Sequence, residues 1–241
     1  MKLIKVKGIV VREAAYSESD KIVTILTDEL GLISAIAKGA RKTKSALLAS
    51  TQYLVYSEFI LFKGTSFYHI NSAETISIFY GLKTDLDMLD KIYPMTRALS
   101  YLLNENVETS EILKTFLNVL YFMQEKKKNA YELVNIFRIR TVKLLGFFPE
   151  VTFCNVCKNN LDGEDIDKVY YDYVSNIFIC SKCANNKSSR LLKIPKPCYM
   201  YIRYISTLDM KKCFAISLKE EYINDLDKFG QALIDCVCNS Y

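Results

Sequence analysis

Hydrophobic and polar residues alternate through the first 80 residues, with the period of two that is typical of strands. The pattern predicts five strands: Ile4 to Val11, Lys21 to Thr27, Leu32 to Lys38, Tyr53 to Phe62 and Ser66 to Ala73. One longer connection separates the third strand from the fourth. Short strands in this order favour a closed barrel of the OB type. An SH3-like barrel fits the same pattern.

The period becomes helical after residue 83. Thr84 is predicted to cap a first helix, which Pro94 should kink or restart. A second helix is predicted to begin at Ser110 and to carry one apolar stripe. A third, from Ala130 to Leu145, is apolar on nearly every side, so we expect it to be the central helix of a bundle.

The helical pattern resumes after Pro197, and Ser217 to Glu220 forms a capping box that predicts a last helix. We therefore expect an α+β multidomain protein. Its predicted parts are a barrel at 1–80, a helical domain at 81–150 and 188–241, and a metal-binding insertion at 151–187.

Two cysteine pairs with the spacing Cys-x2-Cys lie in the predicted insertion: Cys154 with Cys157, and Cys180 with Cys183. The residues from Lys168 to Cys180 read as a hairpin that returns the second pair to the first. Four thiolates form the ligand set of a closed structural zinc site, so one Zn²⁺ per chain is expected. Iron, disulfides and four unrelated core cysteines are the alternatives.

Composition narrows the class of protein. Half of the 241 residues are hydrophobic and 24% are charged, and no apolar run is long enough for a membrane helix. The charged start does not resemble a secretory signal, so eight cysteines indicate a reducing cytoplasm. His69 is the single histidine, and no catalytic motif is found. Enzymatic activity is not expected.

A basic segment follows the third predicted strand. Lys38, Arg41, Lys42 and Lys44 cluster there, and no acidic residue occurs between Glu29 and Glu58. On an OB barrel this segment would border the groove for a single strand, so these cations are predicted to contact phosphates, with Arg12 and Lys21 assisting. Tyr53, Tyr56 and Phe59 could stack on bases. Alternatively, the segment is a solvated loop and the aromatic residues face the core.

Several stretches of the chain resemble the RecO family of bacterial recombination mediators. The resemblance runs through Gly8 to Thr27, Gly31 to Lys42 with its Ala-Lys-Gly-Ala-Arg run, Leu144 to Glu150, and both cysteine pairs, in the family's order. It implies an N-terminal OB barrel, a helical domain and a zinc-binding insertion. The resemblance is weakest in the C-terminal helical region.

The resemblance also implies a function. RecO proteins bind single- and double-stranded DNA, anneal complementary strands, and act with RecR, in the pathway that includes RecF, to load RecA onto DNA coated by the single-strand binding protein SSB. That implies a cytoplasmic, nucleoid-associated protein of DNA repair and recombination. Family members also bind the acidic C-terminal tail of SSB, which ends in Phe.

The third helix offers a place for such a tail. Arg138, Arg140 and Lys143 lie among apolar residues that include Phe137. Cations beside an apolar pocket suit an acidic peptide that ends in an aromatic ring. The alternative is that these cations extend from a buried helix to solvent.

Two other functions compete with a DNA-repair mediator. One is a zinc-ribbon ribosomal or transcription accessory factor that binds RNA. The other is a zinc hydrolase, against which the closed four-cysteine set and the solitary histidine both argue.

Overall fold

The computed structural model describes residues 2–163, 166–185 and 190–239. Residue contacts divide the chain into two units, Met1–Glu125 and Lys126–Tyr241, and each is described by itself below. The boundaries predicted at 80 and 150 remain predictions, and the one at 187 lies outside the described residues. Within the described residues, no helix is both long and apolar enough to cross a membrane.

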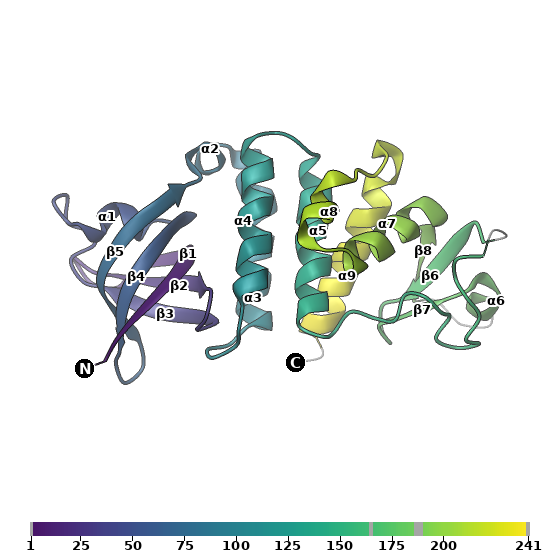
Figure 1. Cartoon of the computed structure of the whole chain (residues 1–241), viewed down its shortest axis with the longest axis horizontal. Helices are drawn as coiled ribbons and strands as arrows, with labels where there is room; N and C mark the ends of the chain where they lie inside the picture. The colour runs from purple at the N-terminus through teal and green to yellow at the C-terminus, as the bar shows by residue number, and fades with distance from the viewer. Residues whose placement is uncertain (1, 164–165, 186–189, 240–241) are drawn as a thin grey trace. The chain divides into compact units, whose positions relative to one another are not determined.

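The first unit contains the predicted barrel (Figure 1). Its strands are β1 (Leu3–Ala15), β2 (Lys21–Thr27), β3 (Leu32–Ala37), β4 (Val55–Lys63) and β5 (Tyr68–Ile78). They close in the order β1-β2-β3-β5-β4, and β3 pairs parallel with β5 at Ala35 and Tyr68. The other neighbouring strands are antiparallel. The predicted OB-type barrel is confirmed.

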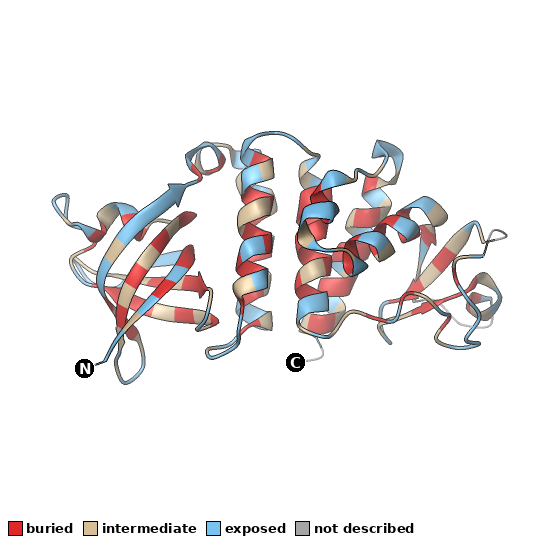
Figure 2. Cartoon of the chain, in the orientation of Figure 1, coloured by how far each residue is buried: buried red, intermediate tan, exposed pale blue. Residues whose placement is uncertain are grey.

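Buried residues alternate with less buried ones along the strands, as the period of two requires (Figure 2). The central residues are fully or almost fully buried: Val6, Val10, Val23, Ile25, Ile33, Ala35, Phe59 and Leu61. Phe59 has no exposed surface, so the prediction that it stacks on bases is wrong. His69 is a strand residue, as expected, and its ring stacks on Phe62 at 4.9 Å between centroids.

Helices α1 (Leu47–Ser50), α2 (Tyr80–Lys83), α3 (Leu86–Leu102) and α4 (Ser110–Gln124) complete the first unit. Asp85 rather than Thr84 caps α3, because its carboxylate accepts a hydrogen bond from Met88 N at 3.2 Å. The helix also continues through Pro94 instead of restarting there. The stripe predicted for the second helix is confirmed, with Leu113, Phe116 and Leu120 buried.

The connection between α3 and α4 is bonded to the barrel. Asn106 N donates to Leu30 O at 2.9 Å, and Thr109 Oγ1 donates to Thr27 O at 2.7 Å. Gly31 has a φ of +76°, and a Cβ at that position would lie 2.3 Å from Asn104 O. Only glycine therefore lets this connection lie so close to the turn between β2 and β3.

The second unit is built around α5 (Ala130–Leu144). Ten of its fifteen residues are buried, which confirms its prediction as a central helix. Around it lie α7 (Lys196–Thr207), α8 (Met210–Ala215), a 3-10 turn (Glu220–Tyr222) and α9 (Ile223–Cys238). The unit also holds a sheet in the order β7-β6-β8, formed by β6 (Lys168–Asp172), β7 (Ile177–Ile179) and β8 (Leu191–Pro195), and the single turn α6 (Ser181–Ala184).

The predicted capping box at Ser217 is wrong. Helix α9 begins at Ile223, and its N-terminus has no side-chain cap. Instead, the segment before it is bonded to α5 through Glu132, whose Oε1 accepts hydrogen bonds from Leu218 N at 3.0 Å, Tyr201 OH at 2.5 Å and Lys128 Nζ at 2.8 Å. Lys128 Nζ in turn donates to Ser217 Oγ at 2.8 Å and to Ile216 O.

Candidate metal centre and nucleic-acid surface

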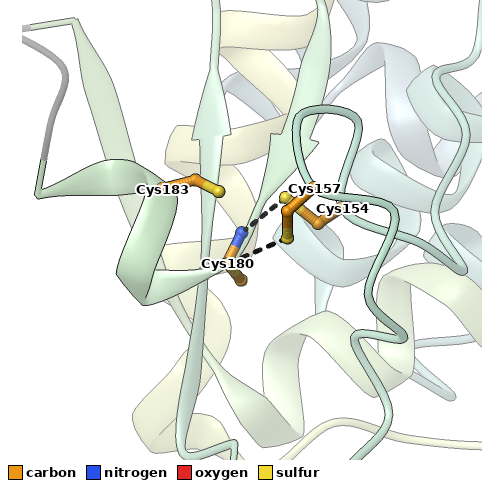
Figure 3. Close-up of side chains that lie close together, drawn as sticks. All are labelled: Cys154, Cys157, Cys180 and Cys183. Atoms are coloured by element: carbon orange, nitrogen blue, oxygen red, sulfur yellow. Dashed lines mark hydrogen bonds between the residues drawn. The ribbon is translucent and has the colours of Figure 1, made fainter.

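The four predicted cysteine ligands converge in the second unit (Figure 3). Their sulfur atoms all lie within 4.8 Å of one another, and Cys157 Sγ is 3.7 Å from Cys180 Sγ. A tetrahedral zinc ion with Zn–S bonds of about 2.3 Å separates its sulfur ligands by about 3.8 Å. The donor set and the spacing therefore fit a four-thiolate metal site.

The first cysteine pair lies in a tight turn. Cys154 N donates to Asn159 O and Lys158 N donates back to Cys154 O, both at 2.8 Å. Lys158 has a φ of +62°, in the left-handed region, which reverses the chain directly after Cys157. Asn155 N donates to Phe178 O at 2.9 Å and so attaches this turn to β7.

The second pair follows β7 directly. Cys180 comes immediately after the strand, at the N-cap position of α6, and Cys183 lies one turn later on that helix. Strand β6 pairs with β7 at Tyr170 and Ile179, which confirms the predicted hairpin. Cys180 N also donates to Cys154 Sγ at 3.4 Å, so the two pairs are connected without a metal ion.

Electrostatics at the four sulfur atoms is unequal. Burial opposes ionisation of Cys154, but backbone N–H groups of Cys157, Cys180 and Val156 outweigh it and lower the pKa of that thiol to about 6. Burial and the neighbouring thiols raise the pKa of Cys183 to about 12. A thiol with the raised pKa of Cys183 keeps its proton at neutral pH, so a metal ion that binds this sulfur must displace that proton.

None of the eight cysteines, all of which lie in the described part of the chain, forms a disulfide. Cys198 and Cys213 are buried, and Cys236 and Cys238 are half-buried. The disulfide alternative is therefore not what the structure shows.

An aromatic cluster packs the four-cysteine hairpin against the helices. The Tyr171 and Phe229 rings lie 4.9 Å apart, and Phe178 lies 5.6 Å from Phe229 and 6.0 Å from Tyr199. All four side chains are fully buried. The hairpin is thus held by apolar packing as well as by its cysteines.

The basic segment forms an ordered turn between β3 and α1. Gly39 has a φ of +67°, and its N–H donates to Asp20 Oδ1 at 2.7 Å. Arg41 N donates to Ser19 O at 3.0 Å, and Arg41 Nη1 donates to Ser17 O at 2.6 Å. The residues that hold this turn, 17–20, were not identified from the sequence. The only local signal was an aspartate with two nearby serines, which is common in loops.

The structure brings Lys38, Arg41, Lys42 and Lys44 together on this turn, and all four are exposed. The side chains of Lys42 and Lys44 make no hydrogen bond or ion pair in the described part of the chain. Lys21 is different, because its Nζ bonds Glu13 at 2.5 Å and its side chain is 15% exposed. Arg12 is exposed on β1, beside α3 rather than beside the turn.

The residues predicted to bind an acidic tail lie in different environments. Phe137 is buried, and Arg138 donates to Asn135, Asp227 and Gln231 at 2.8 to 3.1 Å. Burial lowers the pKa of Arg138, and Asp227 opposes that shift. Arg140 donates to the carbonyls of Ile205 and Leu208 at 3.3 and 2.7 Å. Only Lys143 of the set is exposed, so the tail site stays a prediction.

These features place the chain in a class: OB-barrel proteins with a helical region and four clustered cysteines whose geometry fits a metal site. Residues 1–79 match the family model for the N-terminal part of recombination protein O, and residues 85–238 match its C-terminal part. The chain therefore belongs to the RecO family.

Individual relatives agree with this assignment. A protein of Acetivibrio thermocellus named DNA repair protein RecO is 36% identical over 231 residues, which cover 96% of this chain and 90% of the relative. Proteins of the same name from Caldicellulosiruptor saccharolyticus and Clostridium perfringens are 31% and 28% identical. The matched regions cover 94% and 98% of this chain, and 89% and 94% of those relatives.

Proposed function

We propose that this protein is a DNA repair and recombination mediator that binds single- and double-stranded DNA and anneals complementary strands. The observation that carries the proposal is the exposed basic turn on a closed OB barrel, in a chain of the RecO family. A cluster of cations held at fixed positions suits a phosphate backbone. Annealing and loading need binding alone, so no catalytic residue is required and the protein is not an enzyme.

Family membership also supports partners. The protein would act with RecR, and indirectly with RecF, to load RecA onto DNA coated by SSB, on nucleoid DNA in the bacterial cytoplasm. Mixing labelled complementary DNA strands with purified protein tests the central activity. The expected result is annealing faster than without protein. If the protein does not accelerate annealing and binds one RNA sequence in preference to others, the alternative of an RNA-binding accessory factor is favoured.

Neutralising the basic turn tests the assigned phosphate contacts. Arg41→Ala with Lys42→Ala should weaken binding to all DNA sequences alike, because phosphate contacts carry no sequence information. The salt dependence of binding should flatten by roughly one unit of slope for each lost contact. A pair of changes at Lys5 and Lys114, which are exposed and ion-paired elsewhere in the same unit, is the matched control. An unaltered slope in the first variant would reject the assignment.

We further propose that Cys154, Cys157, Cys180 and Cys183 hold one structural Zn²⁺. When bound, the ion would neutralise the converging thiolates and hold the two turns together. All four positions are taken by protein sulfur, which leaves no position for a reacting water.

The proposed docking of the SSB tail is tested best at Lys143, because Arg138 and Arg140 are bonded inside the unit. A labelled tail peptide should bind less tightly to Lys143→Ala than to the parent protein if α5 is the site. Lys126→Ala, an exposed cation before α5, is the control. Equal binding by the parent and both variants means that the tail docks elsewhere.

A further inference from the structure

A small hollow lies between the barrel and α3 in the first unit. Its volume is about 250 Å³. Its polar lining consists of Arg12 from β1 and Tyr93, Thr96, Arg97, Ser100 and Tyr101 from α3. No carboxylate lines it, so two cations, two phenol rings and two aliphatic hydroxyls face one space.

The two arginines are available to bind an anion. A bulge in β1 between Val10 and Arg12 alters the register there, which is how strands re-aim a side chain. Arg12 makes no side-chain hydrogen bond or ion pair within the described residues. Arg97 contacts the Tyr101 hydroxyl at 3.3 Å and lies 5.8 Å from the centre of that ring. In the part of the chain that the structure describes, neither arginine has a carboxylate partner.

The two tyrosines offer flat surfaces on a rigid support. Tyr93, Arg97 and Tyr101 are spaced four residues apart, so they follow one face of α3. Tyr93 is 64% exposed and Tyr101 is 58% exposed. Tyr53, just before β4, makes a hydrogen bond with Thr96 at 3.4 Å. The next residue, Leu54, donates from its N to Val10 O on β1 at 2.9 Å, so this stretch of α3 is held near β1. Exposed rings beside arginines that have no carboxylate partner among the described residues suit stacked bases with their phosphates.

The hollow is connected to the basic turn through paired strands. Ala15, three residues after Arg12, pairs with Lys21, which pairs with Ala37, the neighbour of Lys38. Three residues along a strand and two steps between strands each span about 10 Å. One extended nucleic-acid strand could therefore reach both places.

We propose that this hollow is a second contact site for single-stranded DNA. Arg12 and Arg97 hold phosphate, and Tyr93 or Tyr101 stacks on a base. The proposal rests on the proposed DNA-binding function and adds α3 to the surface that carries it.

The experiment measures binding of a fluorescent oligothymidine of about 16 nucleotides, the upper range for one OB barrel, across a salt series. Arg12→Ala with Arg97→Ala should reduce the salt slope by about 1.4, at about 0.7 for each contact with a single strand. Tyr93→Leu with Tyr101→Leu should weaken binding about tenfold at unchanged slope, because stacking is lost and charge is kept. The control variant, Lys5→Ala with Lys114→Ala, removes the same amount of charge elsewhere in the unit. It should change the affinity and the salt slope less than the hollow variants do.

Photocrosslinking supplies a readout that does not depend on affinity. An oligonucleotide with 5-iodouracil at successive positions should crosslink to Tyr93 or Tyr101 of the parent protein, as mapped by mass spectrometry. This proposal would be overturned if both hollow variants kept the parent's affinity and salt slope while the Arg41 and Lys42 variant bound DNA more weakly. The proposed DNA-binding function would then still hold. A parent protein that does not bind the oligonucleotide at all would overturn the proposed function itself.

Discussion

The two units reach stable folds by different means. The barrel closes on itself, and its core consists of apolar side chains from every strand. The second unit instead buries polar residues on its central helix, among them Glu132, Asn135 and Arg138. It also relies on a sheet of short strands beside four clustered cysteines.

Besides burial of apolar surface, the two units need different things to be stable. A closed barrel has no free edges, so its backbone hydrogen bonds and its core form together. In the second unit, each buried charge must keep its partner, because an unpaired charge away from water is costly. We therefore expect the second unit to respond strongly to loss of metal or of charge, and the barrel to respond to changes of packing.

The largest effect is expected from removing a thiolate. Cys180→Ser should reduce the zinc content from one ion per chain to almost none, because a structural zinc site requires its full ligand set. Since metal-binding energy at such sites is folding energy, the hairpin should lose protection from hydrogen exchange. Amides of β1 to β5 should keep theirs.

Elemental analysis and hydrogen exchange measure both parts of this prediction. Cys238→Ser, at a half-buried cysteine far from the cluster in sequence, is the control and should bind zinc normally. A Cys180→Ser protein with the parent's zinc content and stability would contradict the proposed metal site.

The buried ion pair gives the next largest effect. Glu132→Gln leaves the Lys128 ammonium, whose side chain is 3% exposed, without its counter-charge. Breaking such a pair costs about 3–5 kcal/mol, which urea unfolding of the second unit should detect. Glu220→Gln, at an exposed carboxylate, should cost almost nothing.

A double variant separates charge from packing at the same place. Replacing Lys128 by Met and Glu132 by Leu removes both charges and should recover part of the lost stability. If the single change at Glu132 unfolds no more easily than the parent, the pair does not stabilise this unit.

A smaller effect, confined to the barrel, is expected at Phe59. Phe59→Leu removes ring atoms from a fully buried position and should cost about 1–2 kcal/mol. Zinc content should not change, because Phe59 belongs to the other unit. Loss of zinc in this variant would show that the two units do not respond separately.

The smallest effect concerns the basic turn and its dependence on pH. The Gly39 N–H, with the hydroxyls of Ser17 and Ser19 and the charge of Lys38, lowers the pKa of Asp20 although desolvation opposes the shift. Because the pKa of Asp20 is lower in the folded state than the ordinary value of about 3.9, the ionised carboxylate stabilises the turn at pH values above that value. That contribution is lost as the pH falls through the lowered pKa.

Asp20→Asn should therefore loosen residues 38–46 at neutral pH, as measured by faster exchange of the Gly39 and Arg41 amides. Asp90→Asn, on the exposed side of α3, is the control. Equal exchange in the parent and the Asp20 variant at neutral pH would mean that the carboxylate does not hold the turn.

Much of the fold could be predicted because its signals are local. The strands β1 to β5, the helices α4, α5, α7 and α9, and the hairpin β6-β7 each follow from a period of two or 3.6 read over neighbouring residues. The Cys-x2-Cys spacing likewise describes one tight turn at a time, and the clustering of Lys38, Arg41, Lys42 and Lys44 is visible in the chain itself.

The remaining features depend on contacts between residues that are distant in sequence. No long pattern marks the short helices α1, α2 and α8 or the strand β8. The capping box expected at Ser217 does not form, because this segment bonds Glu132 on α5 and Lys128 just before that helix. Phe59 faces the interior because the closed barrel surrounds its side chain. Arg12 and Arg97 line the same hollow because α3 lies beside β1. The hydrophobic period predicts which face of a helix or strand is buried. Which residues contact that face depends on the packing of the whole chain.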